Sequence, residues 1–569
     1  MSDQFHEPKA RRPLREVVSD IDRDILRLLM RRHNLLRKMH NAKGFLDPSE
    51  EKGLREAWEA AVSRVSRDAR LSSRFFSLMQ EVDFLPRPED GEERRAAFNL
   101  APPALPVRLD MEAPLACRAS RAWLFLAAAS GHPLTLGPCL MNDPIVDCVK
   151  LFNQMGAALN REDASVVAAA ATPMTAPDKV LHAGDSAWNF YLALAFYLGR
   201  PSRTKFTGDT SLKLGDFSPV RRLMPSLGAR LVHVVPKSDG FPIRIECSGA
   251  LPDSLRFPAE APIELAEALL LAGSFYERPL RIDLADHPHK DILRRRTLPI
   301  LRAVNAKLEE DGDAFRISPS DISLPQHPLP PMEPELALFL LALAPALGGE
   351  VRLRGRWPDY PGAQAGLALL GACGATVDCR DDAVVCSAAA PLKTLPAQAL
   401  SALDDDFPAD WLPLPIALAA AAALRDGDAA LPVIRDSQLR ADAQGFLMDL
   451  GLDALDGKAR TRALPADNGG NGEEGEERRV DRHPWNAPTP VWAMALAVAA
   501  CAHGARTGFK LGNPGIITGL YPAFWALYNG LPEPRMQRPA EKTAPAAPKR
   551  RRVITNAIAV LPEPRDEDY

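Results

Sequence analysis

The sequence predicts an α/β fold made of repeated units and preceded by a small all-helical domain. The first observation is a recurring segment, in which an apolar helix, a glycine-containing break and a short stretch of β character follow one another. It occurs six times, at 121–137, 187–208, 262–284, 334–355, 412–434 and 490–512. The second observation is a more amphipathic helix, usually closing on glycine, after most of these segments. Such self-similarity indicates one supersecondary unit whose copies bury one another's apolar faces.

The third observation concerns the N-terminal region, whose apolar positions have the spacing of helices. One long helix is expected over 14–44, and two further helices are expected at 54–66 and 72–84. Together they predict an all-α domain over residues 1–85. The next segment is rich in proline and charge, so we expect a linker over 86–108.

The repeated segments are expected to form two groups of three, divided near residues 326–334. This division gives a first half over 109–328 and a second half over 329–533. A stretch rich in glycine and charge interrupts the fifth unit, and its composition predicts a disordered insert at about 456–482. The tail 534–569 is also expected to be unpacked.

Composition excludes several classes of function. With 69 Lys and Arg against 73 Asp and Glu, the formal net charge is −4, so no basic field points to nucleic acid or to an anionic membrane. The longest apolar runs fall short of the ~20 residues that a membrane span needs, and the first residues lack the apolar core of a signal peptide. The eight cysteines include no CxxC pair and no histidine at ligand spacing. We therefore expect reduced thiols, a cytoplasmic location, and neither a metal site nor another cofactor.

Three cations of the long N-terminal helix are candidates for a binding site. Arg32 and Lys43 are eleven residues apart, so they share a face and lie ~16 Å apart along the axis. Arg15 lies well round the helix, and only an antiparallel partner copy would return it to the same pocket. The alternative interpretation is a solvated basic face.

The segment LREVVSDIDRDILRLLMRRHNLLRKMHNAKG, at 14–44, resembles the first helix of the all-helical chorismate mutases, and the resemblance extends over 14–85. It implies an intertwined homodimer whose cations bind the two carboxylates of chorismate. Lys43 would stabilise charge on the breaking ether oxygen. The residue that accompanies this lysine in the family, a Gln or Glu, corresponds here to Arg87. The positions that match the family's charged ligands are Arg15, Arg32, Lys43, Asp47 and Glu51.

The six repeated units resemble the enolpyruvyl transferases of the 5-enolpyruvylshikimate-3-phosphate synthase (3-phosphoshikimate 1-carboxyvinyltransferase) family. Local similarities occur at PLACRASRA (114–122), AGDSA (183–187) and PADWLP (408–413). The resemblance implies a two-domain inside-out α/β barrel whose halves close on phosphoenolpyruvate and shikimate 3-phosphate. It also implies a place in aromatic amino acid biosynthesis, which a neighbouring chorismate mutase-like domain supports.

The resemblance also assigns site residues in this body. Asp410 corresponds to the family's catalytic carboxylate. The positions that match substrate-binding residues are Arg121, Ser186, Lys213 and Arg440. The partners that follow are small anionic metabolites, with no nucleic acid and no membrane.

Several cationic positions of the family are missing. Its G-S-K-S opening corresponds to LACR (115–118), which lacks the lysine, and its final lysine corresponds to Gly519. One charge-assisted hydrogen bond is worth ~1.5–3 kcal/mol, and ~1.4 kcal/mol changes a rate tenfold. Ordinary transferase activity should therefore be very weak unless other cations have replaced the missing ones. The candidates for replacement are Arg118, Lys205, Arg221, Arg222, His287, His289 and Lys290.

Three hypotheses follow. The chain is a shikimate-pathway enzyme that carries out enolpyruvyl transfer with a divergent site, fused to a chorismate mutase-like module. Alternatively, the body is a non-catalytic protein that binds a metabolite or a partner enzyme. In the third hypothesis only the N-terminal module is catalytic.

Overall fold

The computed structural model describes most of the repeated body and part of the N-terminal region. The described ranges are 48–62, 98–393, 407–455, 457–461, 484–502 and 508–534, with a few single positions outside them. In the N-terminal region, α2 (Pro48–Val62) begins earlier than the helix expected at 54–66. Single described positions between residues 25 and 36 are also helical. Residues 462–483 and 535–569 lie outside the described residues.

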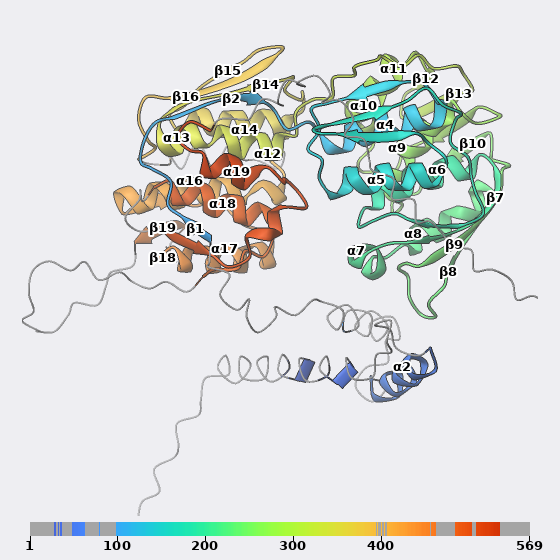
Figure 1. Cartoon of the computed structure of the whole chain (residues 1–569), viewed down its shortest axis with the longest axis horizontal. Coiled ribbons are helices and arrows are strands. Elements are labelled where there is room, and N and C mark those ends of the chain that lie inside the picture. The colour runs from blue at the N-terminus through green and yellow to red at the C-terminus, as the bar shows by residue number, and fades with distance from the viewer. Residues whose placement is uncertain are drawn as a thin grey trace, which may run out of the picture.

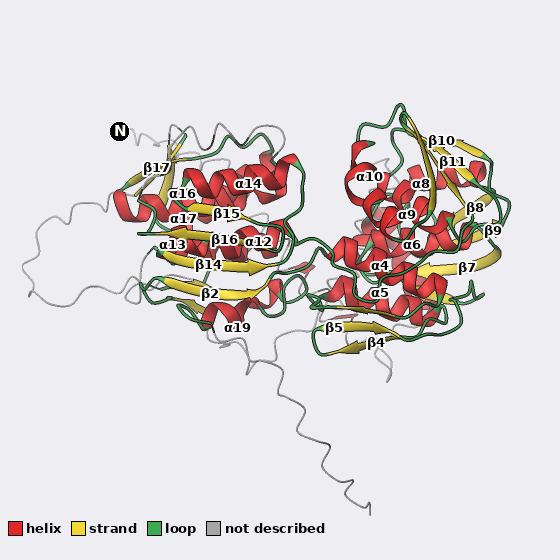
Figure 2. Ribbon diagram, turned by 90° about the horizontal axis from the view of Figure 1, so that it is seen from above, coloured by secondary structure: helices red, strands yellow, loops and turns green. Residues whose placement is uncertain are grey.

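The body consists of two halves that lie side by side (Figures 1 and 2), each with its own hydrophobic core. Each of the six repeated segments contains a helix followed by a strand. In the first half, these helices are buried and contact one another: α4 (Cys117–Ser130), α6 (Ala187–Leu198) and α9 (Ile263–Gly273). The sequence explains this position, because a helix that is apolar on all sides, such as AWNFYLALAFYL, is stable only when surrounded.

Three sheets of the first half surround its buried helices. In spatial order, the strands of the first sheet are β3 (Leu134–Leu136), β5 (Ser165–Ala168) and β4 (Leu159–Glu162). Those of the second sheet are β6 (Val180–His182), β7 (Pro201–Thr207), β9 (Ile243–Ser248) and β8 (Ala229–His233). Those of the third sheet are β10 (Ser254–Arg256), β11 (Leu280–Asp283), β13 (Ala314–Ser318) and β12 (Lys307–Asp311). The further helical segments are α5 (Asp143–Gln154), α7 (Thr210–Leu214), α8 (Ser218–Leu223), the 3₁₀ turn η1 (Met224–Leu227), α10 (Asp291–Arg296) and α11 (Leu298–Ala303).

The second half repeats this order of elements. Its buried helices are α12 (Pro334–Leu341), α13 (Leu343–Leu347), α16 (Pro413–Asp426) and α18 (Pro490–Ala500). The strands of its first sheet are, in spatial order, β15 (Thr376–Cys379), β16 (Ala383–Ala388), β14 (Gly349–Arg354) and β2 (Val107–Glu112). The second sheet consists of β17 (Asp428–Ala430), β19 (Lys458–Thr461) and β18 (Leu452–Leu455). The third sheet consists of β1 (Phe98–Leu100) and β20 (Phe509–Leu511). The other helical segments are α14 (Pro361–Ala372), α17 (Ser437–Asp449), α19 (Phe524–Asn529), and the 3₁₀ turns η2 (Ala409–Trp411) and η4 (Pro514–Ile517).

Two expected boundaries differ from the structure. Residues 109–112 were assigned to the first half, but they belong to β2, which pairs in parallel with β14 of the second half. The alternating burial along β2 explains this, because its apolar side chains extend the second core. The insert expected from residue 456 begins with a strand, since β19 pairs with both β17 and β18.

From β1 onward, the chain therefore begins in the second half, crosses to the first and returns. The two crossing segments are hydrogen-bonded to each other. Ala116 N donates to Pro331 O at 2.8 Å, and Glu333 N donates to Pro114 O at 2.7 Å. No helix in the described ranges is both long and apolar enough to span a membrane.

Candidate functional site at the junction of the two halves

Buried helices of both halves begin close to the crossing segments. Glu333, which precedes α12 of the second half, accepts a hydrogen bond from the backbone N of Cys117, the first residue of α4 in the first half, at 3.1 Å. We call the charged residues that act on one another here the junction cluster. They are Arg118, Arg121, Arg296, Glu264, Glu267, Glu333, Glu335 and Asp410.

Arg121 and Ser186, which the sequence predicted as substrate-binding residues, are in contact. The buried Arg121 donates from Nη1 to Ser186 Oγ at 2.6 Å and to Asn189 Oδ1 at 3.0 Å, and from Nε to Cys117 O at 3.2 Å. Ser186 is the N-cap of α6, where its Oγ also accepts from Asn189 N. This arginine is thus held by the protein's own oxygens.

Arg118 is bound by carboxylates of α9. Its guanidinium contacts the Glu267 carboxylate and lies 3.7 Å from that of Glu264. It also lies over the ring of Trp188, with 4.0 Å from Cζ to the ring centroid, a distance typical of a cation–π contact. Glu267 is buried and accepts a second hydrogen bond, from Thr297 Oγ1, at 3.0 Å. Burial lowers the pKa of Arg118, whereas the charge of Glu267 raises it.

The Glu333 carboxylate lies at the start of α4, where it accepts the hydrogen bond from Cys117 N. A helix N-terminus presents unpaired amides and a partial positive charge, so it is a natural place for an anion. Here the anion is a side chain of the protein itself. Burial raises the pKa of Glu333, while its hydrogen bond to Cys117 and the charges of Arg296 and Arg121 lower it.

Glu335 and Asp410 form the acidic side of the cluster in the second half. Burial, together with the negative charges of Glu333 and Asp410, raises the pKa of Glu335 to about 7. Asp410 is exposed in η2, directly before α16. The Glu335 carboxyl group can therefore take up or release a proton near neutral pH, as acid–base chemistry requires.

A second contact joins the halves beside this cluster. Asn142 accepts from Cys117 Sγ at 3.4 Å and donates from Nδ2 to Leu520 O at 3.1 Å. A Cβ at Gly519 would lie 2.6 Å from Asp143 Oδ2. The position that matches the family's final lysine is thus packed so closely that a side chain there requires Asp143 to move.

Two other predicted residues have structural partners elsewhere. Arg440 is exposed, and its Nη2 donates to Ile434 O at 2.6 Å, in the loop that precedes α17. Lys213 lies in the last turn of α7. The first turn of that helix is held by Asp185, whose carboxylate accepts from both N and Oγ of Ser211 at 2.7 Å.

The predicted residues of the N-terminal region are described only in part. Arg32 is helical and half-buried, and burial lowers its pKa. Glu51 lies in α2. Arg15, Lys43 and Asp47 lie outside the described residues.

Sequence reasoning missed most of the junction cluster. Glu264, Glu333 and Glu335 all lie at the first positions of apolar helices, and this shared placement is the signal that could have found them. Arg296 lies in the last turn of α10. It is exposed, yet its charge acts on Glu333. Among the replacement candidates, Lys290 is instead paired with Asp313.

Solved structures of known proteins have a fold similar to that of this chain. EPSP synthase from Acinetobacter baumannii superposes with a TM-score of 0.57 at 18% identity, covering 76% of this chain and 97% of that chain. The enolpyruvyl transferase NikO from Streptomyces tendae gives a TM-score of 0.50 at 14% identity, covering 74% and 94% of the two chains. The chain has the EPSP synthase fold. No family model matches the sequence.

One curated relative is also similar to this chain in amino-acid sequence. A 3-phosphoshikimate 1-carboxyvinyltransferase from Oceanobacillus iheyensis is 26% identical over 217 residues, which are 37% of this chain. The match spans 48% of that relative, or about half its length. On the EPSP synthase fold, this chain carries a junction in which Arg118 is paired with internal carboxylates and Arg121 with other internal oxygens.

Proposed function

We propose that this chain is an enolpyruvyl transferase-like protein of the shikimate pathway whose junction binds a metabolite without ordinary transfer of an enolpyruvyl group. Transfer from phosphoenolpyruvate to shikimate 3-phosphate requires two phosphates and a carboxylate to be held together. Such a site needs several cations free to meet them. The cytoplasmic location expected from the sequence is part of this proposal.

The observation that carries the proposal is the pairing of the cluster's cations with the protein's own groups. Arg118 is bound to Glu264 and Glu267, and the Glu333 carboxylate accepts a hydrogen bond from the backbone amide of Cys117 at the start of α4. The three arginines of the cluster face five carboxyl groups, so its formal net charge is negative when all five are ionised. A ligand with several negative charges would have to displace these carboxylates from Arg118, at the cost of leaving Glu267 buried without its charged partner. A ligand with one anionic group or none suits the junction better.

We further propose that the repeated units form the inside-out barrel of the enolpyruvyl transferases. In this proposal Asp410 retains the family's carboxylate, while Arg121, Ser186, Lys213 and Arg440 are remnants of its substrate-binding set. The contact between Arg121 and Ser186 supports the correspondence. The departures at LACR (115–118) and at Gly519 explain why these remnants do not suffice.

For the N-terminal region we propose a chorismate mutase-like module that forms a homodimer and binds a chorismate-like dicarboxylate. Arg15, Arg32, Lys43, Asp47 and Glu51 would line its site. The support is an unusually apolar exposed surface on the described helical positions, where Ile25, Leu28 and Leu35 are 46%, 63% and 53% exposed. Single exposed apolar residues are common, but three at described helical positions so close in sequence favour a partner.

The test of the junction is release of phosphate from phosphoenolpyruvate and shikimate 3-phosphate by the purified chain. The Acinetobacter baumannii EPSP synthase, assayed in parallel, is the positive control. We expect a rate at least about a thousandfold below that control, because two or more charge-assisted contacts are missing. Turnover within tenfold of the control would refute the proposal.

The N-terminal module is tested separately on the full chain. We expect a dimer in solution by light scattering, and saturable binding of chorismate that Arg32→Gln weakens about tenfold. An Arg55→Gln variant, which changes a cation of α2 instead, serves as the matched control. A monomeric chain that binds no chorismate would contradict this part of the proposal alone.

A further inference from the structure

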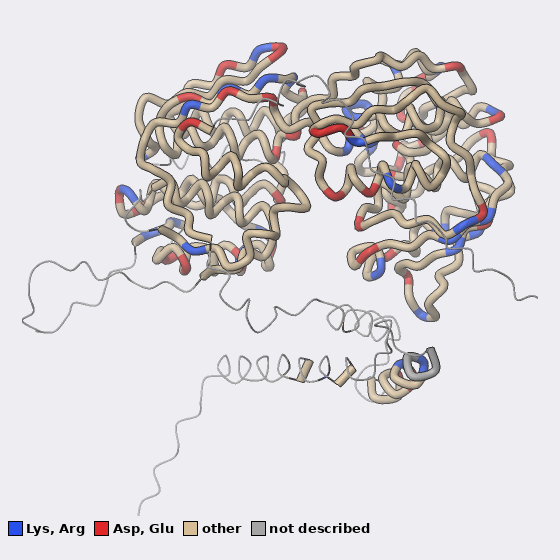
Figure 3. The backbone as a smooth tube through the Cα atoms, in the orientation of Figure 1, with Lys and Arg blue, Asp and Glu red and all other residues tan. Residues whose placement is uncertain are grey.

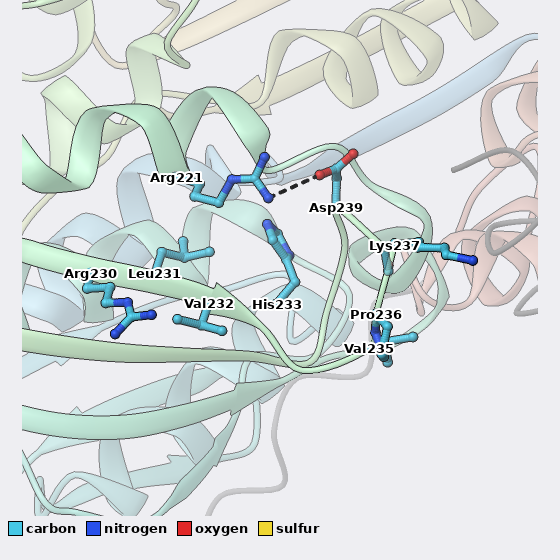
Figure 4. A pocket seen from close by; sticks show the side chains of 10 residues that line it. Arg221, Arg230, Leu231, Val232, His233, Val235, Pro236, Lys237 and Asp239 are labelled. Atoms are coloured by element: carbon cyan, nitrogen blue, oxygen red, sulfur yellow. Dashed lines mark ion pairs between the residues drawn. The ribbon is translucent and has the colours of Figure 1, made fainter. Parts of the chain in front are cut away.

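A cavity of about 400 Å³ lies at the edge of the first half, away from the junction cluster. Its walls come from α8, from the edge strand β8 and from the loop that connects β8 to β9. Three cations line it, Arg221, Arg230 and Lys237, together with His233 and Asp239. Figure 4 shows Arg221 and Asp239 side by side, with His233 beneath them and Arg230 further along β8. Cavities that hold small metabolites typically have volumes of about 300–1,000 Å³.

Charges in this cavity are balanced differently from those at the junction. Arg221 Nη1 lies 3.6 Å from the buried Asp239 carboxylate, and Lys237 Nζ lies 3.3 Å from Glu59 Oε2 of α2. Arg230 is exposed and has no side-chain partner among the described residues. The cavity therefore has a cation available to a ligand.

The register of the sheet explains why Arg230 has no carboxylate partner among the described residues. Glu246 of β9 stands directly opposite it, but the Glu246 carboxylate lies 3.7 Å from Arg203 and 3.5 Å from Arg244. Lys205 lies opposite Arg244 on the same face of the sheet. Arg203, Lys205, Arg230 and Arg244 thus lie on the same face of β7, β9 and β8 as Glu246, and only Arg203 and Arg244 are paired with it. Figure 3 shows Lys and Arg gathered in the region that Figure 1 labels β8 and β9. Such an excess of one charge attracts ligands of the opposite sign.

The loop backbone adds a second observation. Lys237 has φ of 60°, in the left-handed region that a lysine adopts at a cost of about 1–2 kcal/mol. Strain of this kind persists where the surrounding structure fixes the residue, and it is common at binding sites. Here the turn brings the Lys237 side chain to the wall of the cavity.

We propose that this cavity binds a small dianion, a phosphate ester or a dicarboxylate. The guanidinium group of Arg230 provides the forked donor that suits both kinds of oxyanion, and Lys237 and Arg221 supply further positive charge. The His233 ring lies on the opposite face of β8 from Arg230, where donation from Nδ1 to Gly240 O at 2.9 Å fixes the loop that carries Lys237. The site is separate from the junction and does not depend on the function proposed for it.

The proposal is tested by calorimetric titration of the full chain with inorganic phosphate and with succinate, in chloride buffer. We expect saturable binding of one of them at about 1 mM or tighter, weakened by added salt. Phosphate preference assigns a phosphate ester, and succinate preference assigns a dicarboxylate. Absence of saturable binding by both would overturn the proposal.

Variants locate the binding. Arg230→Gln changes an exposed side chain and should weaken binding about tenfold or more, since it removes one charge-assisted contact. Arg316→Gln, the same change at an exposed position of β13, should leave binding unchanged. The double variant Arg230→Gln with Lys237→Gly should abolish saturable binding without lowering the melting temperature, because glycine relieves the positive φ. Binding by the double variant within twofold of wild type would refute the site.

Discussion

At the residue scale, Arg118 shows how internal carboxylates have taken the place of a ligand. Its guanidinium contacts Glu267, Glu264 and the face of Trp188, so its positive charge is largely balanced within the protein. Its Nε is buried and has no hydrogen-bond partner among the described residues. A buried ion pair of this kind costs desolvation to form, but removing one partner costs more, because it leaves the other charge buried alone. The two glutamates differ in this respect, since Glu267 is 1% exposed and Glu264 is 36% exposed.

The first prediction uses the difference in exposure between Glu267 and Glu264. Glu267→Gln should lower the free energy of unfolding by about 3 kcal/mol, because Arg118 and Thr297 lose a charged acceptor in a buried site. Glu264→Gln, the matched control, should cost about 1 kcal/mol or less, since the pair is longer and exposed. Urea unfolding followed by tryptophan fluorescence measures both. Equal effects of the two substitutions would show that Glu267 does not hold Arg118 as described.

The second prediction concerns the dependence of stability on pH. The pKa of Glu335 is raised from 4.5 to about 7 in the folded protein. Between these values the native chain binds more protons than the unfolded chain, so the contribution of Glu335 to stability falls as pH rises through this window and stays low above it. Glu335→Gln should therefore stabilise the protein at about pH 8, by an amount on the order of 2 kcal/mol, and much less at about pH 5.

Melting temperatures at the two pH values check this prediction. Glu350→Gln, at an exposed position of β14, is the control and should change little at either pH. A stabilisation by Glu335→Gln that is equal at both pH values would contradict the raised pKa.

At the scale of elements, close approach of backbones fixes how helices and loops fit together. Gly240, in the loop between β8 and β9, lies against α7. A Cβ built at Gly240 would be 1.9 Å from Lys213 O and 3.0 Å from Leu212 O. Because both obstacles are backbone atoms, neither can rotate away. The position of Lys213 in the fold thus depends on a glycine in a different element.

The third prediction compares two glycine substitutions. Gly240→Ala should destabilise the protein by about 3 kcal/mol or more, since the loop must separate from α7. Gly371→Ala, in the last turn of α14, has no atom within 4 Å of the new Cβ and should stabilise by about 0.5 kcal/mol. Thermal unfolding distinguishes the two. A neutral Gly240→Ala would mean that the loop does not pack on α7 in this way.

The elements were largely predictable from the sequence, whereas their partners were not. An all-apolar helix such as α6 is recognised by composition, and the glycine breaks mark where helices end. The pairing of Arg118 with Glu267 joins residues 149 positions apart, and no local pattern records it. Asp410 was found only through resemblance to a family, and its effect on Glu335 only through geometry. Charged residues at the starts of buried helices were visible, but their mutual distances depend on how the units pack.

At the scale of the whole molecule, the chain crosses between the halves twice, and this determines what each half needs. The first core is formed entirely by residues after Cys117 and before the return crossing. The second core includes β1 and β2, which precede the first half in sequence. Sequence periodicity failed at this boundary because the short strand β2 has no helix of its own ahead of it. The partner strand β14 comes more than two hundred residues later.

The fourth prediction follows from this topology. A fragment of residues 329–533, the second half as periodicity defines it, should fail to fold alone. It lacks the buried side chains of Val107, Leu109 and Met111, whose burial contributes about 1.5–3 kcal/mol each, a large fraction of the 5–15 kcal/mol that stabilises a domain. Adding a peptide of residues 98–112 should restore solubility and a cooperative thermal transition by circular dichroism, because it completes the edges of β14 and β20. A fragment of residues 113–328, which contains the whole first core, should fold without addition and serves as the control. If the 329–533 fragment unfolded as sharply alone as with the peptide, the strands that precede the first half would not be part of the second core.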